Sequence, residues 1–447
     1  MSIPSAERAP RLRFTASPRT PHLYRLWQNL AAHAELPQVD RWLAQYFRAE
    51  KRFGKKDRQW YADAIFTALR LGPLLLLLDA EELTGDVSRL AEVARAMADT
   101  AQLWPRLRGI PAERLFLWLS LYADDAALFS ALEPEKSAWV LAFKQQLAST
   151  QSWDLLVLSA GIPAAYAASL QKRRELSHWT DAQLQLFLTQ QNRKAPLWLR
   201  VNQVHKIAEA RAECQAREIA FTEYGGAWQI DASKSLQNLA CLEQGILEIQ
   251  DLASQDIGNA LALEGVRTVW DCCAGGGGKT LQIASRLQDR GIVYASDVRS
   301  YKLAEVARRA ARAGFSQVKT LPWDGQGLPA FPRSVVDRGG VDVILIDAPC
   351  TGTGTWRRSP DAKYRSDARE IRSLSALQLS IFSHVINGLR PGGQLVYATC
   401  SWLPEENEDI VRQALERHKE LELESMQLCG NPSSDADTMF YAVLRKK

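Results

Sequence analysis

The chain has 447 residues, of which 46% are hydrophobic and 24% are charged, and its formal net charge is +4. These values are typical of a soluble globular protein, and the length predicts two or three domains. The longest apolar runs, 74–78 and 138–143, are too short to span a bilayer, so we expect no membrane partner. Seven cysteines without a CxxC pair and six scattered histidines predict free thiols in the cytoplasm and no metal site.

The N-terminal third of the chain has a helical pattern. Residues 1–22 are rich in Pro and Arg and lack periodicity, so we expect a flexible arm there. From 23 to 144, apolar residues recur every three or four positions, which predicts an all-helical domain. We expect Gly72 and Pro73 to end one of its helices.

Positive charge is concentrated in three stretches of the chain. They are the first 60 residues, 299–319 and 357–372, and aromatic side chains are interspersed among their lysines and arginines. A single cluster of this kind is often a solvated helix face, but three clusters with aromatics fit a polyanionic partner better. At the helix junction 51–58, we expect Lys55 and Lys56 to contact RNA.

Residues 145–238 predict a short helical segment followed by a small α/β module. The alternating stretch 196–202 is typical of a strand, 207–217 of a helix, and 219–221 and 228–230 of two further strands. Small mixed modules of this kind can present a sheet to RNA, which would fit the basic clusters.

From 239 to 447 the pattern changes to alternating strands and helices. This alternation predicts a doubly wound, Rossmann-like parallel sheet with right-handed crossovers, in which ligands bind at the carboxyl ends of the strands. The predicted strands are 268–272, 292–296, 317–321, 341–346, 394–399 and 439–445, and the predicted helices are 280–288, 299–313, 376–389 and 405–417.

The turn after the first of these strands predicts a cofactor site. Its glycines let a ligand approach the backbone without a Cβ in the way. Asp297 ends the next strand, where an acid can accept two ribose hydroxyls, and Asp324 follows the third strand, where it can meet an adenine amino group. We therefore expect a nucleoside-bearing cofactor to lie across the strand ends. The turn consists of Cys273, Ala274, Gly275, Gly276, Gly277, Gly278 and Lys279.

A phosphate-binding P-loop is the competing interpretation of this turn. Gly278-Lys279-Thr280 matches the end of such a loop, and 344–347 resembles the acidic strand that holds magnesium in ATPases. However, the P-loop requires a glycine five residues before its last one, and position 273 is a cysteine. An ATPase would also give no role to Cys350 and Cys400, two cysteines at strand ends, so it is the least favoured alternative.

Two cysteines follow strands at the expected ligand edge. Cys350 follows Asp347-Ala348-Pro349, and Cys400 follows Thr399. A single cysteine is most often a small core residue, but two at a ligand edge predict a nucleophilic thiolate. A nucleoside cofactor, a thiolate and a polyanion together indicate methylation of a pyrimidine at C5: the thiolate adds to C6, and Asp347 stabilises the charge near N3 and O2. These residues alone do not rank the two cysteines.

The region from 196 to 447 resembles the Sun/RsmB-type RNA (cytosine-5)-methyltransferases. Residues 271–280 are similar to the family's motif for binding S-adenosylmethionine (SAM), with Gly275-Gly276 where members usually have Ala-Pro. The stretches 347–350 and 399–401 are similar to its two catalytic motifs. The resemblance implies that Cys400 is the nucleophile and that Cys350 helps to release the product.

The same resemblance extends to possible RNA contacts. The basic turn 356–363 is similar to one in the family, which implies that Arg357, Arg358 and Lys363 touch the RNA backbone or the target base.

A short similarity in the helical region bears on the substrate. Lys56–Arg58 and Ala68–Arg70 resemble the NusB-like domain of the bacterial rRNA members, which favours small-subunit rRNA over tRNA. We expect a monomer that binds RNA and uses SAM. The alternative from another class is a non-catalytic RNA-binding factor in ribosome assembly, which would need none of the three residues Asp347, Cys350 and Cys400.

Overall fold

The computed structural model describes residues 18–82, 99–123, 134–150, 152–230 and 238–447, together with the single residues 94, 97 and 236. The chain divides into two units. The helical unit comprises the chain up to Gln171 with 185–194 and 356–367, and the sheet unit comprises 172–184, 195–355 and 368–447. The predicted arm lies outside the described residues as far as position 17, and the first helix begins at Thr20, within the last residues of that arm.

The described residues between 23 and 144 are largely helical, as the apolar spacing predicts. Two further helices, α10 (Ala167–Leu176) and α11 (Asp181–Gln191), have residues in both units. The helices of the helical unit are α1 (Thr20–Ala31), α2 (Val39–Ala49), α3 (Lys55–Glu82), α5 (Leu103–Gly109), α6 (Ala112–Ala123), α8 (Pro134–Ser149) and α9 (Trp153–Ser159), with short 3₁₀ turns at Thr100–Gln102 and Ala164–Tyr166.

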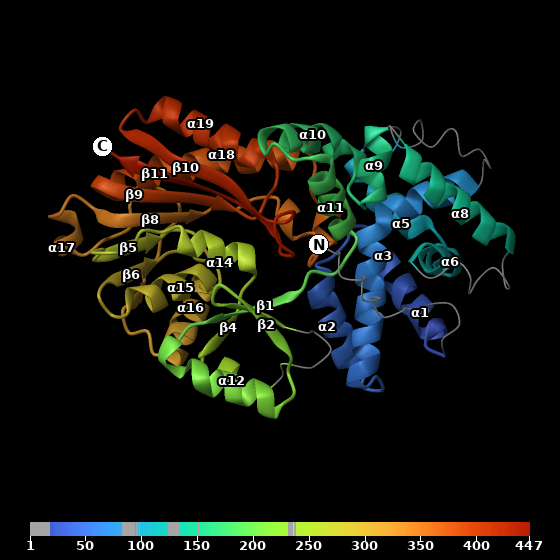
Figure 1. Ribbon diagram of the computed structural model, residues 1–447, viewed down its shortest axis with the longest axis horizontal. Coiled ribbons are helices and arrows are strands. Elements are labelled where there is room, and N and C mark those ends of the chain that lie inside the picture. Colours follow the sequence, from blue (N-terminus) through green and yellow to red (C-terminus); the bar gives the residue numbers. More distant parts are fainter. Residues whose placement is uncertain are drawn as a thin grey trace. The chain divides into compact units, whose positions relative to one another are not determined.

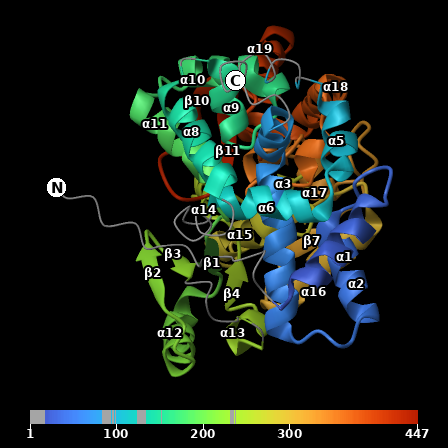
Figure 2. The same ribbon diagram turned by 90° about the vertical axis from the view of Figure 1, so that its right-hand side faces the viewer.

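Helix α3 is the core of the helical unit and packs against α5, α6 and α9 (Figures 1 and 2). Among the described residues, it is the one helix long and apolar enough to cross a membrane, although its individual apolar runs are short. Of its most apolar window, 78% is buried inside the protein. The apolar character of α3 is therefore that of a central core helix.

The predicted end of a helix at Gly72 and Pro73 is wrong, because α3 continues through both residues. Proline has no N–H, so the carbonyl of Leu69, four residues earlier, lacks its helical partner. The Tyr364 hydroxyl donates a hydrogen bond to this carbonyl, with an O–O distance of 2.7 Å. A side chain at Gly72 would collide with the same hydroxyl, so the glycine leaves the space in which Tyr364 lies.

We expect Tyr364→Phe to lower the unfolding free energy by about 1–3 kcal/mol, because it leaves the buried Leu69 carbonyl without a donor. Urea unfolding followed by circular dichroism measures the change. In a Pro73→Ala background, the backbone N–H at position 73 can bond to Leu69, and Tyr364→Phe should cost clearly less. Equal losses in the two backgrounds would contradict the pairing of Tyr364 with the proline.

The sheet unit begins with a small antiparallel sheet in the order β2-β3-β1-β4. Helix α12 (Ile207–Ala216) contributes Ala210 and Cys214 to the same apolar core. Sequence reasoning missed β4, and the predicted boundary between 238 and 239 separates it from β1, with which it pairs. The strands are β1 (Leu197–Val201), β2 (Phe221–Tyr224), β3 (Ala227–Ile230) and β4 (Leu247–Ile249).

The second sheet of this unit confirms the predicted doubly wound fold (Figure 1). Its order is β10-β11-β9-β8-β5-β6-β7; the five strands from β9 to β7 are parallel, β11 is antiparallel to β9, and β10 is antiparallel to β11. The strands are β5 (Thr268–Asp271), β6 (Ile292–Ala295), β7 (Val318–Thr320), β8 (Val341–Asp347), β9 (Leu389–Thr399), β10 (Leu421–Gly430) and β11 (Thr438–Lys446).

Helices cover both faces of this sheet, which explains why the middle of its central strand, 343–346, is an uninterrupted apolar run. Val343 and Leu345 of β8 pack in a core with α14 and α15, whereas Ile344 and Ile346 pack in a core with α18 and α19. Successive side chains of a strand point to opposite faces, so both faces need apolar residues. The helices are α13 (Ala240–Glu243), α14 (Leu252–Asn259), α15 (Gly278–Leu287), α16 (Ser300–Arg312), α17 (Arg333–Val336), α18 (Ala368–Val385) and α19 (Glu408–Arg417).

Candidate functional site

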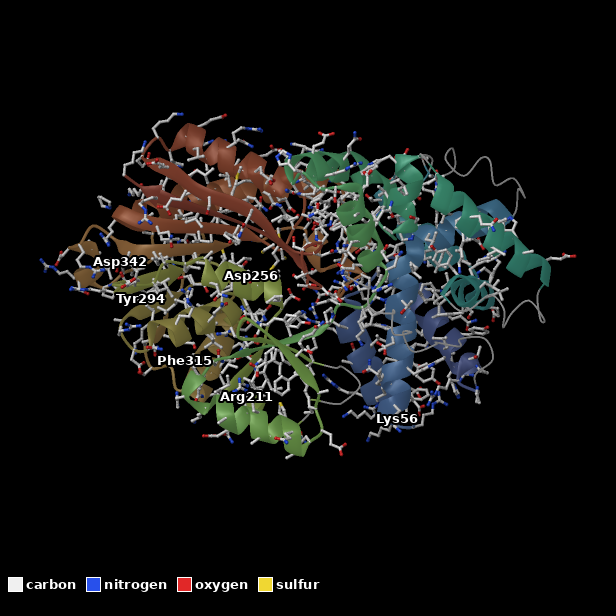
Figure 3. The ribbon with its side chains drawn as sticks, in the orientation of Figure 1. Lys56, Arg211, Asp256, Tyr294, Phe315 and Asp342 are labelled. Atoms are coloured by element: carbon white, nitrogen blue, oxygen red, sulfur yellow. The ribbon has the colours of Figure 1, made fainter. Side chains whose placement is uncertain are left out.

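The candidate site lies at the carboxyl ends of the central parallel strands. Asp271 ends β5, Asp347 ends β8, and Cys400 directly follows β9. In the register of the sheet, Asp271 lies beside Leu345 of β8, and Asp347 lies beside Ala398 of β9. The topology therefore brings the acids and the cysteine to one edge. Asp342 lies near the start of β8, at the opposite edge (Figure 3).

The glycine turn between β5 and α15 needs its glycines. Gly275 and Gly277 have φ angles of +53° and +87°, in the left-handed region where a Cβ is unfavourable. A Cβ at Gly277 would also lie 3.1 Å from the side chain of Val306. The Gly275 N–H donates a hydrogen bond to Asp297, with an N–O distance of 3.0 Å. The turn thus exposes backbone beside a carboxylate, as a cofactor site requires.

Asp297 is oriented from two sides. Its Oδ1 accepts hydrogen bonds from the backbone N–H and the side chain of Arg299, both at 2.9 Å, and its Oδ2 accepts from Gly275 and Arg299. Burial raises the pKa of Asp297, but these hydrogen bonds and the Arg299 charge outweigh it and lower the pKa overall. The carboxylate is therefore ionised and held in a fixed orientation.

A cleft with a volume of about 780 Å³ opens beside Asp297. Trp323 lines it, and the exposed Asp324 lies at the same cleft, where its Oδ1 accepts the backbone N–H of Gln326. Val298, whose side chain is 68% exposed, contributes an apolar wall. A cleft with an apolar wall and the two carboxylates of Asp297 and Asp324 fits a flat ring whose edge and attached sugar carry hydrogen-bond donors.

Asp271 has a buried oxygen available to a ligand. Its Oδ2 accepts a hydrogen bond from the Thr280 hydroxyl at 2.6 Å, whereas its buried Oδ1 has no partner among the residues that the structure describes. Burial raises the pKa of Asp271 to about 7; the Thr280 hydrogen bond opposes this rise, and the charge of Asp347 adds to it. An unsatisfied acceptor next to the glycine turn suits a donor group of the cofactor.

Lys279, predicted to bind the cofactor, forms a partly buried ion pair with Asp347. The Nζ–Oδ2 distance is 2.8 Å. Burial lowers the pKa of Lys279, but Asp347 and then the nearby Cys400 and Asp271 outweigh this effect, and the pKa rises. The site therefore contains a fixed positive charge next to the predicted catalytic acid.

Cys350 and Cys400 are in contact, with an Sγ–Sγ distance of 3.3 Å, and both are half-buried. The hydrogen bond to Cys400 and then burial raise the pKa of Cys350 well above its ordinary value. Either thiol can donate the hydrogen bond that joins the two sulfur atoms. Cys273, the cysteine predicted to bind the cofactor, is also half-buried and lies 3.9 Å from Cys272, measured between the Sγ atoms.

Sequence reasoning missed two buried polar residues behind the cysteines. Glu406 and Asn407 are both 0% exposed. Glu406 bonds to Thr351, and Asn407 bonds to Thr399 and to the backbone of Ser401. The signal that could have revealed them is a run of acids and amides, 405–408, so soon after Cys400.

The structure corrects two of the predicted RNA contacts. Arg357 and Lys363 belong to the helical unit and are only 1% and 2% exposed. Lys363 Nζ donates to the carbonyls of Arg70 and Gly161, at 2.9 and 2.6 Å. Burial, with the Arg70 charge, lowers the pKa of Lys363 well below its ordinary value. Both side chains bond to backbone carbonyls and do not face solvent, so the predicted RNA contact does not hold for them.

The remaining predicted RNA contacts are more accessible. Arg358 is half-buried, whereas Lys55 and Lys56 are exposed at the beginning of α3 (Figure 3). They lie close in sequence to α2, on which the half-buried rings of Trp42 and Tyr46 stack with their centroids 5.6 Å apart. Exposed cations beside partly exposed aromatics are the usual surface for RNA.

Comparison with known sequences identifies a family. Residues 259–444 match the family model described as 16S rRNA methyltransferase RsmB/F. The ribosomal RNA small subunit methyltransferase B of Erwinia tasmaniensis is 35% identical over 246 residues, which cover 54% of this chain and 56% of that protein. The corresponding proteins of Vibrio vulnificus and Escherichia coli are 34% and 33% identical, and each match covers 59% of this chain and 63% of the relative. The matched region thus spans less than two thirds of these relatives, and the predicted family resemblance is confirmed.

Solved structures agree on the fold. A crystal structure of PH0851 covers 98% of this chain and 99% of its own, with a TM-score of 0.67 and 19% identity. The crystal structure of NSun6 from Pyrococcus horikoshii with SFG covers 62% of this chain and 97% of its own, with a TM-score of 0.52 and 19% identity. At these identities the likeness establishes the fold, and it confirms the Rossmann-like methyltransferase architecture.

Proposed function

We propose that this chain, whose residues 259–444 match the RsmB/F methyltransferase model, methylates C5 of a cytosine in small-subunit rRNA. The methyl donor is SAM, and the reaction passes through a covalent bond between Cys400 and C6 of the base. The contact between the two thiols, beside the Lys279–Asp347 pair, is the observation that carries this proposal. The proposal includes a cytoplasmic monomer, in which both thiols stay reduced.

The residues around the glycine turn fit SAM. Asp297 would hold the ribose hydroxyls, and Asp324 would meet the adenine edge in the cleft that both residues line. The left-handed Gly275 and Gly277 let the ligand approach the backbone, and the unsatisfied Asp271 oxygen can accept from an amino group. When bound, SAM supplies an electrophilic methyl group on its sulfonium.

Cys400 begins the reaction as the nucleophile. Its thiolate adds to C6 and forms the S–C6 bond, and the electron pair moved onto the ring makes C5 nucleophilic enough to take the methyl group. The ammonium of Lys279 lies close enough to attract the Cys400 thiolate, and Asp347 is held by the same ammonium near the developing charge of the ring.

Cys350 completes the reaction. Its raised pKa has the hydrogen bond to Cys400 as its largest cause, and this cause disappears once Cys400 is bonded to carbon. Formation of the adduct therefore makes it easier for Cys350 to lose its proton and act as a base. Removal of the C5 proton restores the C5–C6 double bond, breaks the S–C6 bond and returns the Cys400 thiolate.

The helical unit supplies RNA contacts in this proposal. Lys55 and Lys56, with Arg48 and Lys51, are exposed, and they are close in sequence to the half-buried Trp42. Cations bind phosphates without sequence preference, and partly exposed rings can stack on bases. These residues take the role that sequence reasoning gave to the buried Arg357 and Lys363.

A methyl-transfer assay tests the proposal. The full chain is incubated with labelled SAM and either deproteinised small-subunit rRNA or tRNA, and bisulfite sequencing locates the product. We expect label in rRNA as 5-methylcytosine. Label in tRNA alone would change the substrate class, and folded, SAM-binding protein that labels neither RNA would support the non-catalytic assembly factor.

We expect Asp297→Ala to weaken SAM binding by about 10- to 100-fold, because a charge-assisted hydrogen bond contributes ~1.5–3 kcal/mol. Isothermal titration calorimetry measures the affinity. The control is Asp337→Ala, since that side chain is 64% exposed and its residue does not line the cleft. At saturating SAM the Asp297→Ala protein should still methylate RNA; unchanged affinity would contradict the ribose contact.

A further inference from the structure

We propose that Glu406 and Asn407, adjacent in the chain, are positioning residues that each hold one of the two thiols. Glu406 holds the turn that carries Cys350, and Asn407 holds the turn that carries Cys400. The inference rests on the proposed function, because it assigns the two residues to different steps of the same reaction: Asn407 to formation of the adduct and Glu406 to its resolution.

Glu406 and Gln378 together fix the residues on both sides of Cys350: Glu406 bonds to Thr351, and Gln378 bonds to Pro349. Oε1 of Glu406 accepts the backbone N–H of Thr351 at 2.8 Å, and its Oε2 accepts the Thr351 hydroxyl at 2.6 Å. Gln378 of α18 donates to Oε1 at 3.4 Å and to the carbonyl of Pro349 at 2.9 Å. Because Pro349 and Thr351 flank Cys350, the carboxylate and the amide together determine where the Cys350 thiol lies.

Asn407 fixes the residues on both sides of Cys400. Its Oδ1 accepts the Thr399 hydroxyl at 2.6 Å, and its Nδ2 donates to the carbonyl of Ser401 at 2.9 Å. Both partners are completely buried, as is the amide itself. The amide therefore holds the chain immediately before and after the nucleophile and controls the direction of its thiol.

A purely structural role explains these contacts less well. A carboxylate that is 0% exposed is costly to bury, and an apolar side chain of the same size would fill the space without that cost. The side-chain oxygens of Glu406 and the amide of Asn407 bond to neighbours of the cysteines, on Thr351, Thr399 and Ser401. These bonding partners indicate that Glu406 and Asn407 position the thiols, because a small displacement of a thiol alters the chemistry.

The test uses Cys350→Ala as the parent, in which the RNA adduct of Cys400 is expected to persist as a shifted band on a denaturing gel. Adding Glu406→Gln should leave the band unchanged. Glu406 holds the turn at position 350, and in this parent that turn no longer carries a thiol. Adding Asn407→Ala should reduce the band at least tenfold. Glu416→Gln, on the exposed face of α19, is the matched control.

In the otherwise native chain, Glu406→Gln should itself accumulate the adduct and slow turnover at least tenfold, with SAM affinity unchanged. Loss of the band on adding Glu406→Gln to the parent, or survival of the band on adding Asn407→Ala, would overturn this inference and leave the proposed function intact. If the Cys350→Ala parent forms no adduct although the native chain methylates RNA, the proposed cysteine roles fail and the inference fails with them. Calorimetric SAM binding verifies that every variant is folded.

Discussion

Cys400→Ala is expected to abolish methyl transfer to RNA and to leave SAM binding unchanged. The substitution removes the one atom that can bond to C6, so C5 never becomes nucleophilic. SAM binding should persist, because the cofactor residues Asp297, Gly275 and Gly277 belong to other segments of the sheet edge. Methyl transfer is measured with labelled SAM, and binding is measured by calorimetry.

The matched control for this experiment is Cys241→Ala. Cys241 is buried in the core of the small antiparallel sheet, away from the strand ends. The Cys241→Ala protein should retain methyl transfer. A covalent RNA band in Cys400→Ala would show that the two cysteines have the opposite roles, and residual turnover near the native level would exclude Cys400 as the nucleophile.

Cys350→Ala is expected to trap the protein on its RNA. The adduct of Cys400 still forms, because the nucleophile is intact, but the group that accepts the C5 proton is missing. General base catalysis typically contributes about 10²–10⁴-fold, so turnover should fall by that factor while the adduct accumulates. A denaturing gel with labelled RNA shows the adduct as a slower band.

Two observations would contradict this result. A Cys350→Ala protein that turns over at the native rate would show that another group accepts the proton. A protein that loses turnover without any adduct would show that Cys350 is needed before the S–C6 bond forms, for example to orient Cys400 through the 3.3 Å contact.

Sequence reasoning located the strand-end residues because topology determines their positions. In a parallel sheet, all carboxyl ends lie at one edge, so Asp271, Asp347 and Cys400 had to meet there once their strands were recognised. Strand β8 was recognisable because both of its faces are covered by helices, which demands an uninterrupted apolar run. Strand β10 was missed because most of its residues are partly or fully exposed, and because its apolar alternation, which begins at Leu421, is interrupted by a register shift between Leu423 and Ser425.

The misjudged features depend on partners distant in the chain. Helix α3 continues through Pro73 because Tyr364, nearly 300 residues later, donates a hydrogen bond to the carbonyl of Leu69. The helix propensities of the residues around Pro73 cannot reveal that hydrogen bond. Lys363 looked like a surface cation, because nothing nearby shows that Arg70 and Gly161 present carbonyls to it. Composition identifies charge, but only the fold decides whether a charge reaches solvent.

The segment 356–367 has a consequence for how this chain can be divided. It follows the Cys350 turn in sequence, yet its Trp356 and Tyr364 are buried among the helices of the other unit. The two units are therefore interleaved, and no single cut separates them. A truncation that begins at 195 would keep these aromatic rings and the buried Lys363 but remove the helices that bury them, leaving an exposed apolar segment prone to aggregation. An exchange of N-terminal domains between relatives would have to carry this segment along, so the helical unit and the loop are expected to have diverged together.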